Sequence, residues 1–406
     1  MPAEFQEMIP VETAVGLISA SMPSYPAVTL PLSKCHGRIL REPIRADREQ
    51  PPFNRVAMDG FAVAFPTWER GFRRFIIEGR QKAGETPRRL VSELGCIEVM
   101  TGAVMPEGTD CVIPVEEIEI SGNAAVVTEP AKPKRPMQHV HRAGSDCSGG
   151  DVVAPEGVVL TSARIGAAAA FGLASLPVAY SPSVAIIATG DELVDPSKTP
   201  TAHQIRRSNS YAIEAALRQR HIERVALLHS RDEPARLRTS LESVLGKCDV
   251  LILTGGVSMG KTDHVPAALK DLGIKPIFHR VRQKPGKPFW FGVGAGGKPV
   301  FALPGNPASV LVCLYRYVLP GLREAMGGAP EPALKAMLEE EAPAPGTLTQ
   351  FRPVTLRTME SGALGAAFVT NQGSGDFTGW ARCDGFVELA AGESLPKGTP
   401  VPVYLW

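Results

Sequence analysis

Three carboxylates stand at positions where they could act together: Glu192, Asp232 and Asp263. Each follows an apolar run and precedes a segment with helical character. Carboxylates that face one cleft repel each other unless they share a cation, and oxygen donors suit Mg²⁺ or a similar hard divalent ion. The pattern therefore predicts a divalent-cation site. An alternative stays open for Asp232, which could instead cap the helix that follows it.

Two lysines, Lys284 and Lys287, flank a glycine in the segment QKPGKPFWFG. Ammonium groups held on such a turn predict contacts to the anionic part of a substrate. The alternative is that both lysines are solvated and bind nothing. A second basic run, AKPKRPMQHVHRAG at 131–144, contains no acid. It is either a phosphate contact or a solvated hairpin or linker.

Two glycine-bearing loops could present backbone N–H groups to an anion. Glycine permits the tight turns, and the start of a following helix favours negative charge. Neither loop has the Rossmann glycine spacing or the G-K-[ST] of a P-loop. We therefore expect an anionic ligand that is not bound as a standard dinucleotide or nucleoside triphosphate. The alternative is that these glycines only form ordinary turns after the strands. The residues concerned are Gly255, Gly256, Ser258 and Gly260 in TGGVSMGKTDH and Pro304, Gly305 and Asn306 in LPGNPAS.

The elements that must position these residues alternate between strand and helix from about 180 to 327. Continuous apolar strands separated by helices indicate a mainly parallel sheet that is covered on both faces. In such a sheet, ligands bind outside the carboxyl ends of the strands, where the strand order reverses. We expect strands at 183–190, 224–230, 248–256, 277–281, 289–293 and 299–305, and helices at 208–222, 232–245, 265–273 and 306–322.

The rest of the chain has a different sequence pattern. From about 45 to 140, short β-branched segments are separated by Gly, Pro and Asn, which is typical of a small β unit. Residues 331–406 return to the same pattern and predict a second β unit.

Composition narrows the function classes. The length of 406 residues suggests two or three domains of the usual size of about 150 residues. A net charge of +1 gives no general attraction to nucleic acid or to an anionic membrane. The seven cysteines form no C-x-x-C pair, which fits a reducing compartment and provides no zinc framework. With neither a signal pattern nor a long apolar span, we expect a cytoplasmic protein without nucleic-acid or membrane partners.

Together, the motifs resemble one known family. TGDELV, TGGVSMGKTDH, KPGKP and LPGNPAS occur in this order, preceded by PPFNRVAMDGFAV (51–63), TGAVMPEGTDCVIPVE (101–116) and AGSDCSGGDVVAPEG (143–157). This set is similar to the molybdopterin molybdenumtransferases, the family of bacterial MoeA and the gephyrin E domain. The resemblance covers the whole chain.

The resemblance implies a multidomain fold of class α/β plus β. Its parts would be a doubly wound, mainly parallel pterin-binding domain (180–327), an inserted β subdomain that closes the cleft (45–140) and a C-terminal β barrel (328–406). An elongated N-terminal linker and dimerisation domain would take residues 1–44 and 141–179. The resemblance also implies a homodimer.

The implied reaction takes adenylylated molybdopterin and molybdate with Mg²⁺ or another divalent cation, releases AMP and leaves molybdenum on the dithiolene. Protein partners that the resemblance suggests are the molybdopterin adenylyltransferase and the recipient molybdoenzymes. Asp59, Thr101, Glu192, Asp232 and Asp263 would be catalytic, the last three as metal ligands. The substrate-binding residues would be Asp146, Gly255, Gly256, Ser258, Gly260, Lys284, Lys287, Pro304, Gly305 and Asn306.

Some positions depart from the family pattern. Asn54, Arg55 and Val56 replace the usual aspartate, variable residue and serine. Lys261, His264 and His141 also differ, and Lys261 would add a positive charge beside Asp263. These departures leave open a paralogue with altered metal choice, such as tungstate, or altered substrate. Other interpretations are a gephyrin-like scaffold without catalysis and a nucleotide-processing amidohydrolase of the competence-damage type, which the flanking β units disfavour.

Overall fold

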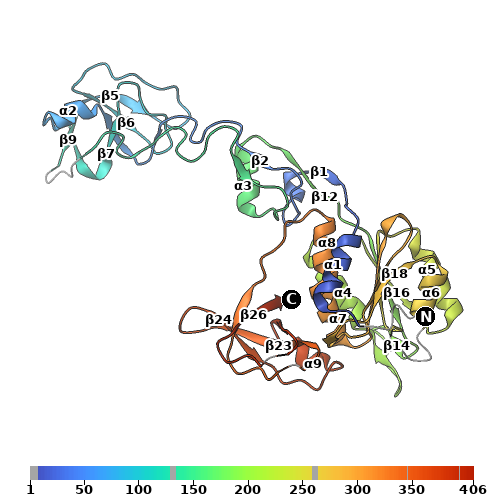
Figure 1. Cartoon of the computed structure of the whole chain (residues 1–406). Helices are drawn as coiled ribbons and strands as arrows, with labels where there is room; N and C mark the ends of the chain where they lie inside the picture. Colours follow the sequence, from blue (N-terminus) through green and yellow to red (C-terminus); the bar gives the residue numbers. More distant parts are fainter. Residues whose placement is uncertain (1–7, 129–133, 258–263, 345, 393) are drawn as a thin grey trace. The chain divides into compact units, whose positions relative to one another are not determined.

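A six-stranded sheet forms the centre of the first of two compact units. The computed structural model describes residues 8–128, 134–257, 264–344, 346–392 and 394–406. The first unit holds residues 1–42, 156–165 and 175–406, and the second holds residues 43–155 and 166–174. Figure 1 shows both units and labels many of their elements.

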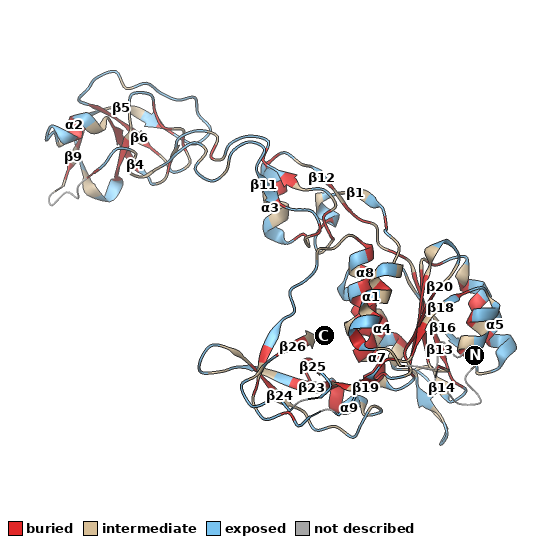
Figure 2. Ribbon diagram, in the orientation of Figure 1, coloured by how far each residue is buried: buried red, intermediate tan, exposed pale blue. Residues whose placement is uncertain are grey.

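The strand order of the central sheet is β16-β13-β17-β21-β20-β18. Pairing is parallel from β16 to β21, and β20 pairs antiparallel with both β21 and β18. Every residue of β13, β17 and β21 is buried, as continuous apolar runs require (Figure 2). This confirms the predicted mainly parallel sheet. The bounds are β13 Val184–Thr189, β16 Val225–Ser230, β17 Val250–Thr254, β18 Lys275–His279, β20 Trp290–Val293 and β21 Pro299–Leu303.

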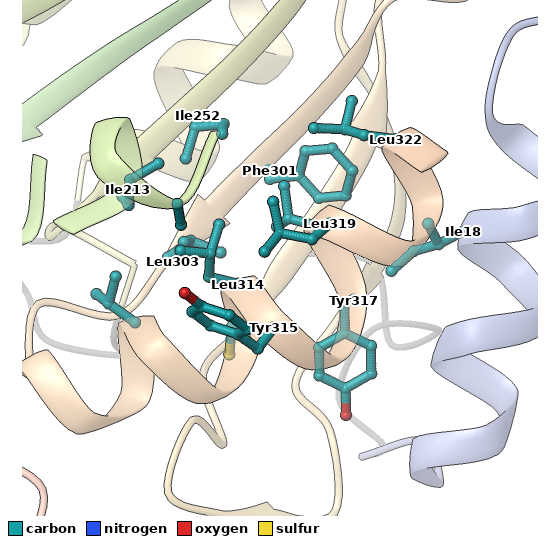
Figure 3. Close-up of a cluster of buried hydrophobic side chains, with 14 of the residues drawn as sticks. Ile18, Ile213, Ile252, Phe301, Leu303, Leu314, Tyr315, Tyr317, Leu319 and Leu322 are labelled. Atoms are coloured by element: carbon teal, nitrogen blue, oxygen red, sulfur yellow. The ribbon is translucent and has the colours of Figure 1, made fainter. Parts of the chain in front are cut away.

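Helices cover both faces of this sheet, which is the doubly wound arrangement. On one face, α1, α4 and the helix that contains α7, η5 and α8 enclose one apolar core, part of which Figure 3 shows. On the other face, α5 and α6 enclose a second core with Leu237, Leu241 and Leu269. The helices are α1 Val11–Ser21, α4 Asn209–Gln219, α5 Pro234–Leu245, α6 Val265–Asp271, α7 Pro307–Cys313 and α8 Leu319–Ala325.

The long helix expected at 306–322 is not uniform. Between α7 and α8 lies a π-helical turn, η5 Leu314–Val318. Pro320 has no N–H to donate to the carbonyl four residues earlier, so the regular ladder cannot continue through this point. Single π turns within α-helices are frequent at functional sites.

The C-terminal part of the first unit is a closed barrel. Its five strands pair in the circle β22–β24–β23–β25–β26–β22, and β19 adds to β23 in parallel. Ring contacts fix the barrel to the long helix, as between Tyr315 and Trp406 at 5.5 Å. The elements are β19 Gln283–Lys284, β22 Lys335–Leu338, β23 Thr349–Thr358, β24 Leu364–Phe368, α9 Phe377–Ala381, β25 Gly385–Leu389 and β26 Pro400–Leu405.

The second unit is built on another six-stranded sheet, ordered β7-β4-β6-β5-β9-β8. Its apolar core contains Phe61, Trp68 and Phe75. Only β5 and β6 pair in parallel. The elements are β4 Gly60–Val63, α2 Phe65–Glu69, β5 Arg74–Gln81, β6 Gly95–Val99, β7 Cys111–Pro114, η3 Val115–Glu117, β8 Ile118–Ser121 and β9 Ala124–Val127.

Short two-stranded pairs complete the structure: β1 with β12, β2 with β11, β3 with β10 and β14 with β15. Among the described residues, no helix is long and apolar enough to cross a membrane. The central sheet with its helices, the barrel and the second sheet confirm the predicted fold class, α/β plus β in several domains. The four-part domain division stays a prediction. The remaining bounds are β1 Ala27–Pro31, η2 Leu32–Lys34, β2 Ile44–Arg45, β3 Arg55–Val56, β10 Val140–His141, β11 Val152–Ala154, α3 Ser162–Ala170, β12 Ser175–Ala179, β14 Leu193–Val194, β15 Ile205–Arg206 and η4 Ala295–Gly297.

Candidate functional site

The predicted loops meet at the carboxyl edge of the central sheet. From β13 the chain passes to β16 on one side, and from β17 it passes toward β18 on the other, so the strand order reverses between β13 and β17. The strand ends lie side by side, because Ala188 pairs with Thr254 and Thr254 with Leu303. This is the position at which open α/β sheets bind ligands.

Gly255 lets two of these loops approach closely. Its φ is +96°, and a Cβ there would lie 2.6 Å from the carbonyl oxygen of Thr189. Its N–H donates to the carbonyl of Leu303 at 3.1 Å. A Cβ on Gly305 would lie 3.7 Å from the Cα of Gly255, so these loops are in contact. Gly255 is thus required by strand-end packing, whatever it binds.

Asn209, at the start of α4, is a site residue that sequence reasoning missed. Its Nδ2 donates to Oγ1 of Thr254 at 3.1 Å and to the carbonyl of Gly305 at 2.7 Å. It therefore ties the ends of β17 and β21 together. Ser208, where the helix was expected to begin, is instead the N-cap residue of α4 and makes no side-chain capping bond. The only available signal for Asn209 was a polar residue at the expected helix start.

The predicted acidic residues Glu192 and Asp232 lie in loops at the same edge of the central sheet, but they do not form a cluster of carboxylates. Glu192 is exposed and Asp232 is half-buried. The backbone N–H of Asp232 donates to Oδ1 of Asp191 at 3.4 Å, and the N-cap of α5 is Glu233. Asp232 is therefore not the helix cap that the alternative interpretation proposed.

The predicted divalent-cation site is not assembled by the described residues. Among them, no group of three or more His, Cys, Asp or Glu side chains could hold a metal ion. The third expected ligand, Asp263, lies outside the described residues, as do Ser258, Gly260 and Lys261. The structure thus describes two of the three expected ligands, and the divalent-cation site stays a prediction.

A cavity of about 420 Å³ lies where two loops face the barrel. One is the segment that carries Lys284 and Lys287 (residues 283–288, here called the lysine loop), and the other is the LPGNPAS loop. Its lining includes Lys284, Lys287 and Arg352, and none of the described lining residues is acidic. Both lysines are exposed. Positive groups that converge on a hollow without carboxylates create a potential that favours an anion. Pro304 and Asn306 also line this cavity, so the structure brings these four predicted residues together.

The barrel side of the cavity was also missed from sequence. Asn306 donates from Nδ2 to Oγ of Ser374 at 2.8 Å, and the N–H of Ala308 donates to the carbonyl of Ser374 at 3.1 Å. Arg352 donates from Nε and one terminal nitrogen to Oε1 of Gln350 at 3.0 and 2.9 Å. Ser374 lies in the polar segment NQGSGD, whose glycines were the only signal.

In the second unit, Asp59 and Thr101 are in direct contact. Oδ1 of Asp59 accepts from both the backbone N–H and the hydroxyl of Thr101, each at 2.7 Å. Asp59 follows β3 and precedes β4, and the chain passes through Thr101 just after β6. These hydrogen bonds, the backbone one first, lower the pKa of the exposed Asp59 carboxyl.

This contact predicts how Asp59 titrates. Because the pKa is lowered on folding, the contact stabilises above the unfolded pKa and is lost as pH falls through the folded one. We expect an NMR titration to place the pKa of Asp59 below its ordinary value. Thr101→Val, which keeps the N–H donor, should raise that pKa only part of the way, and Thr101→Ser should leave it low. A full return to the ordinary value in Thr101→Val would contradict the leading role of the backbone bond.

Asp146 lies in a segment that is hydrogen-bonded to the residues that precede Asp59. Its N–H donates to the carbonyl of Gln50 at 2.8 Å, and the N–H of Ala143 donates to Oδ1 of Asn54 at 3.0 Å. Arg55 and His141, two departures from the family pattern, are register partners on β3 and β10. The segments that carry Asp59, Thr101 and Asp146 thus belong to one local structure.

Lys134, from the basic run, is neither a phosphate contact nor solvated. Its side chain is 1% exposed and pairs with Glu117 at 2.6 Å. Its Nζ also lies 5.9 Å from the centre of the Trp68 ring. The acid that neutralises it comes from η3, which the local sequence could not reveal.

Three family models match consecutive parts of the chain. They are the MoeA N-terminal region (domains I and II) over residues 9–172, a probable molybdopterin binding domain over 185–324 and the MoeA C-terminal region (domain IV) over 335–406.

Whole proteins match along nearly the same length. A molybdopterin molybdenumtransferase of Synechocystis sp. is 37% identical over 401 residues, covering 98% of this chain and all of the relative. Molybdopterin molybdenumtransferase 2 of Mycobacterium tuberculosis is 32% identical, covering 81% and 83% of the two chains. The crystal structure of the molybdopterin biosynthesis MoeA protein from Pyrococcus horikoshii OT3 superposes with a TM-score of 0.82, at 25% identity, over 98% of this chain and 100% of that one.

Proposed function

Because the chain belongs to the molybdopterin molybdenumtransferase (MoeA) family, we propose that it inserts molybdenum from molybdate into adenylylated molybdopterin and releases AMP. Membership makes the chain a transferase of molybdenum cofactor biosynthesis. The proposal concerns the particular reaction. In it, hydrolysis breaks the phosphoanhydride bond to AMP. The two dithiolene thiols form bonds to molybdenum, and one molybdate oxygen leaves as water with the two thiol protons.

The proposal rests on the cavity at the lysine loop, where none of the described lining residues is acidic. Molybdate is an oxyanion, and the reaction also develops charge on phosphoryl oxygens. Three cationic side chains, Lys284, Lys287 and Arg352, line one hollow of about 420 Å³. This volume is within the usual range for small-molecule sites, about 300–1,000 Å³. We infer that the cavity holds the oxyanion.

The neighbouring groups have roles that follow from their chemistry. The lysines and Arg352 would neutralise oxyanion oxygens, and Ser374 and Asn306 would orient the anion by hydrogen bonds. The glycine loops would hold the pterin and its phosphate through backbone N–H groups. Glu192 and Asp232 would orient the water that attacks phosphorus.

The other expectations stay proposals. Asp59, Thr101 and Asp146 are proposed site residues on the second unit, and the homodimer, the cytoplasmic location and the adenylyltransferase and molybdoenzyme partners are inferred from the family alone. A preference for tungstate is an open alternative to molybdate.

The need for a divalent cation has its own test. If Glu192 and Asp232 contribute to binding Mg²⁺, chelation should abolish AMP release, and Glu192→Gln should raise the Mg²⁺ concentration needed for half-maximal rate. Glu214→Gln, on α4, is the matched control, since Glu214 pairs with Arg218 one helical turn away. Full activity in chelator would contradict the cation proposal and leave the oxyanion proposal standing.

The reaction itself is tested with purified chain, adenylylated molybdopterin and Mg²⁺, with and without molybdate. We expect molybdate-dependent AMP release and formation of active cofactor. Binding of the pterin without AMP release under either oxyanion, molybdate or tungstate, would contradict the proposed reaction.

A further inference from the structure

Gln283 stands at the base of the lysine loop and is completely buried. Its Nε2 donates to the carbonyl of Pro285 at 3.0 Å and lies 3.8 Å from Sγ of Cys313. Its Oε1 accepts a hydrogen bond from the hydroxyl of Tyr317. One buried carboxamide therefore joins the loop between the two lysines to the long helix.

Tyr317 belongs to the π-helical turn η5 and is 2% exposed. Its ring lies 5.0 Å from that of Phe289, which follows the lysine loop. Burial raises the pKa of the Tyr317 hydroxyl well above its ordinary value, so this group stays a neutral donor. In Figure 3, the Tyr317 side chain projects from a different side of the helix than that of Tyr315.

The loop fits closely against these groups. Gly286 has φ +93°, and a Cβ there would lie 2.4 Å from Nε2 of Gln283 and 2.9 Å from Sγ of Cys313. The loop also closes on itself, because the N–H of Val281 donates to the carbonyl of Lys287 at 3.0 Å. Meanwhile the backbone of Gln283 pairs with Thr349 of β23. The lysine loop is thus fixed to the barrel by its backbone and to the π turn by one side chain.

We propose that Tyr317 and Gln283 are positioning residues, through which the π turn sets Lys284 and Lys287 at the oxyanion cavity. The inference rests on the proposed function. Tyr317 is not among the residues that line the cavity, and Nε2 of Gln283, which does line it, is engaged by the carbonyl of Pro285 and by Sγ of Cys313. Their effect must therefore come through the geometry of the loop, and the binding of molybdate should respond more than that of the pterin.

The first test is Tyr317→Phe. It removes only a hydroxyl and leaves Oε1 of Gln283 buried without its donor. Losing such a bond is expected to raise KM for molybdate about tenfold, while KM for adenylylated molybdopterin changes less than about twofold. The matched control is Tyr315→Phe in the same π turn. Tyr315 makes a ring contact with Trp406, and its variant should keep both constants.

A second variant separates positioning from simple support of the fold. Tyr317→Phe combined with Gln283→Leu removes donor and acceptor together, which restores much of the lost stability in an apolar site. The bond from Gln283 to the carbonyl of Pro285, which the single variant keeps, is lost in the double variant. We therefore expect the melting temperature to recover in the double variant while KM for molybdate stays raised.

The outcomes are distinct. If KM for molybdate recovers together with melting temperature, the two residues only support the fold, and the inference is wrong. An unchanged KM for molybdate in Tyr317→Phe, in a chain that still releases AMP, would overturn the inference and leave the proposed function intact. Wild-type chain that neither binds molybdate nor releases AMP would overturn both.

Discussion

Lys287→Ala is expected to lower kcat/KM for molybdate by about 10- to 100-fold. A charge-assisted hydrogen bond contributes about 1.5–3 kcal/mol, and each 1.4 kcal/mol corresponds to about a factor of ten. The ammonium group lines the cavity together with Lys284 and Arg352. Lys287 is exposed, so the melting temperature should hardly change. Steady-state AMP release at varied molybdate measures the effect.

Two further variants sharpen this result. Lys287→Arg keeps the charge and should recover part of the loss, although a planar guanidinium does not reproduce the geometry of an ammonium group. Lys275→Ala removes an exposed lysine at the start of β18, away from the cavity lining, and should leave kcat/KM unchanged. If Lys287→Ala behaves like Lys275→Ala, the alternative of a solvated lysine is correct.

Gly255→Ala is expected to destabilise the first unit by about 2–4 kcal/mol. The residue would have to adopt a left-handed φ of +96°, and its Cβ would lie 2.6 Å from a backbone oxygen of Thr189. Strained φ values cost about 1–3 kcal/mol, and overpacking costs a similar amount. Because the clash is with backbone, relief requires separating the ends of β13 and β17. AMP release should fall with stability.

Gly246→Ala provides the control. Gly246 follows α5 with φ −82°, and a Cβ at this position would meet no neighbouring atom within 4 Å. Alanine there should be neutral or slightly stabilising, because it restricts the unfolded chain. Calorimetric melting of both variants measures the difference. Equal melting temperatures would show that the strand ends at Gly255 can separate at little cost.

Local sequence pattern was sufficient for the central sheet. Runs such as 184–189 and 250–254 are apolar almost throughout, which is typical of a strand covered on both faces. The position of the loops after these strands could be predicted as well, because the carboxyl ends of parallel strands lie at one edge of the sheet. The reversed direction of β20 follows from its short turn to β21, where the N–H of Gly294 donates to the carbonyl of Lys298.

The barrel half of the cavity could not be predicted in this way. Arg352 and Ser374 reach the lysine loop only because β19 pairs with β23, a contact between segments more than 60 residues apart. Residue type alone marks neither side chain as functional. The same holds for Asn209, whose importance lies in two acceptors on other strands.

The hydrogen-bond and ion-pair partners of buried polar side chains could not be predicted from the sequence either. Lys134 belongs to a basic run in the sequence, yet its charge is neutralised by Glu117 inside the second unit. Tyr317 has the pattern of a core aromatic residue on a long helix, and only the π turn and Gln283 reveal its hydroxyl as a specific donor. Such roles depend on which segments pack together, which hydrophobic periodicity does not specify.

The most direct test of the oxyanion cavity is anomalous X-ray diffraction from crystals soaked in molybdate, with data at the molybdenum edge. We expect one strong anomalous peak within hydrogen-bond reach of Lys287 and Arg352, and its loss in crystals of Lys287→Ala. A peak elsewhere with this cavity empty, or a peak that persists unchanged in Lys287→Ala, would contradict the assignment of the cavity as the molybdate site.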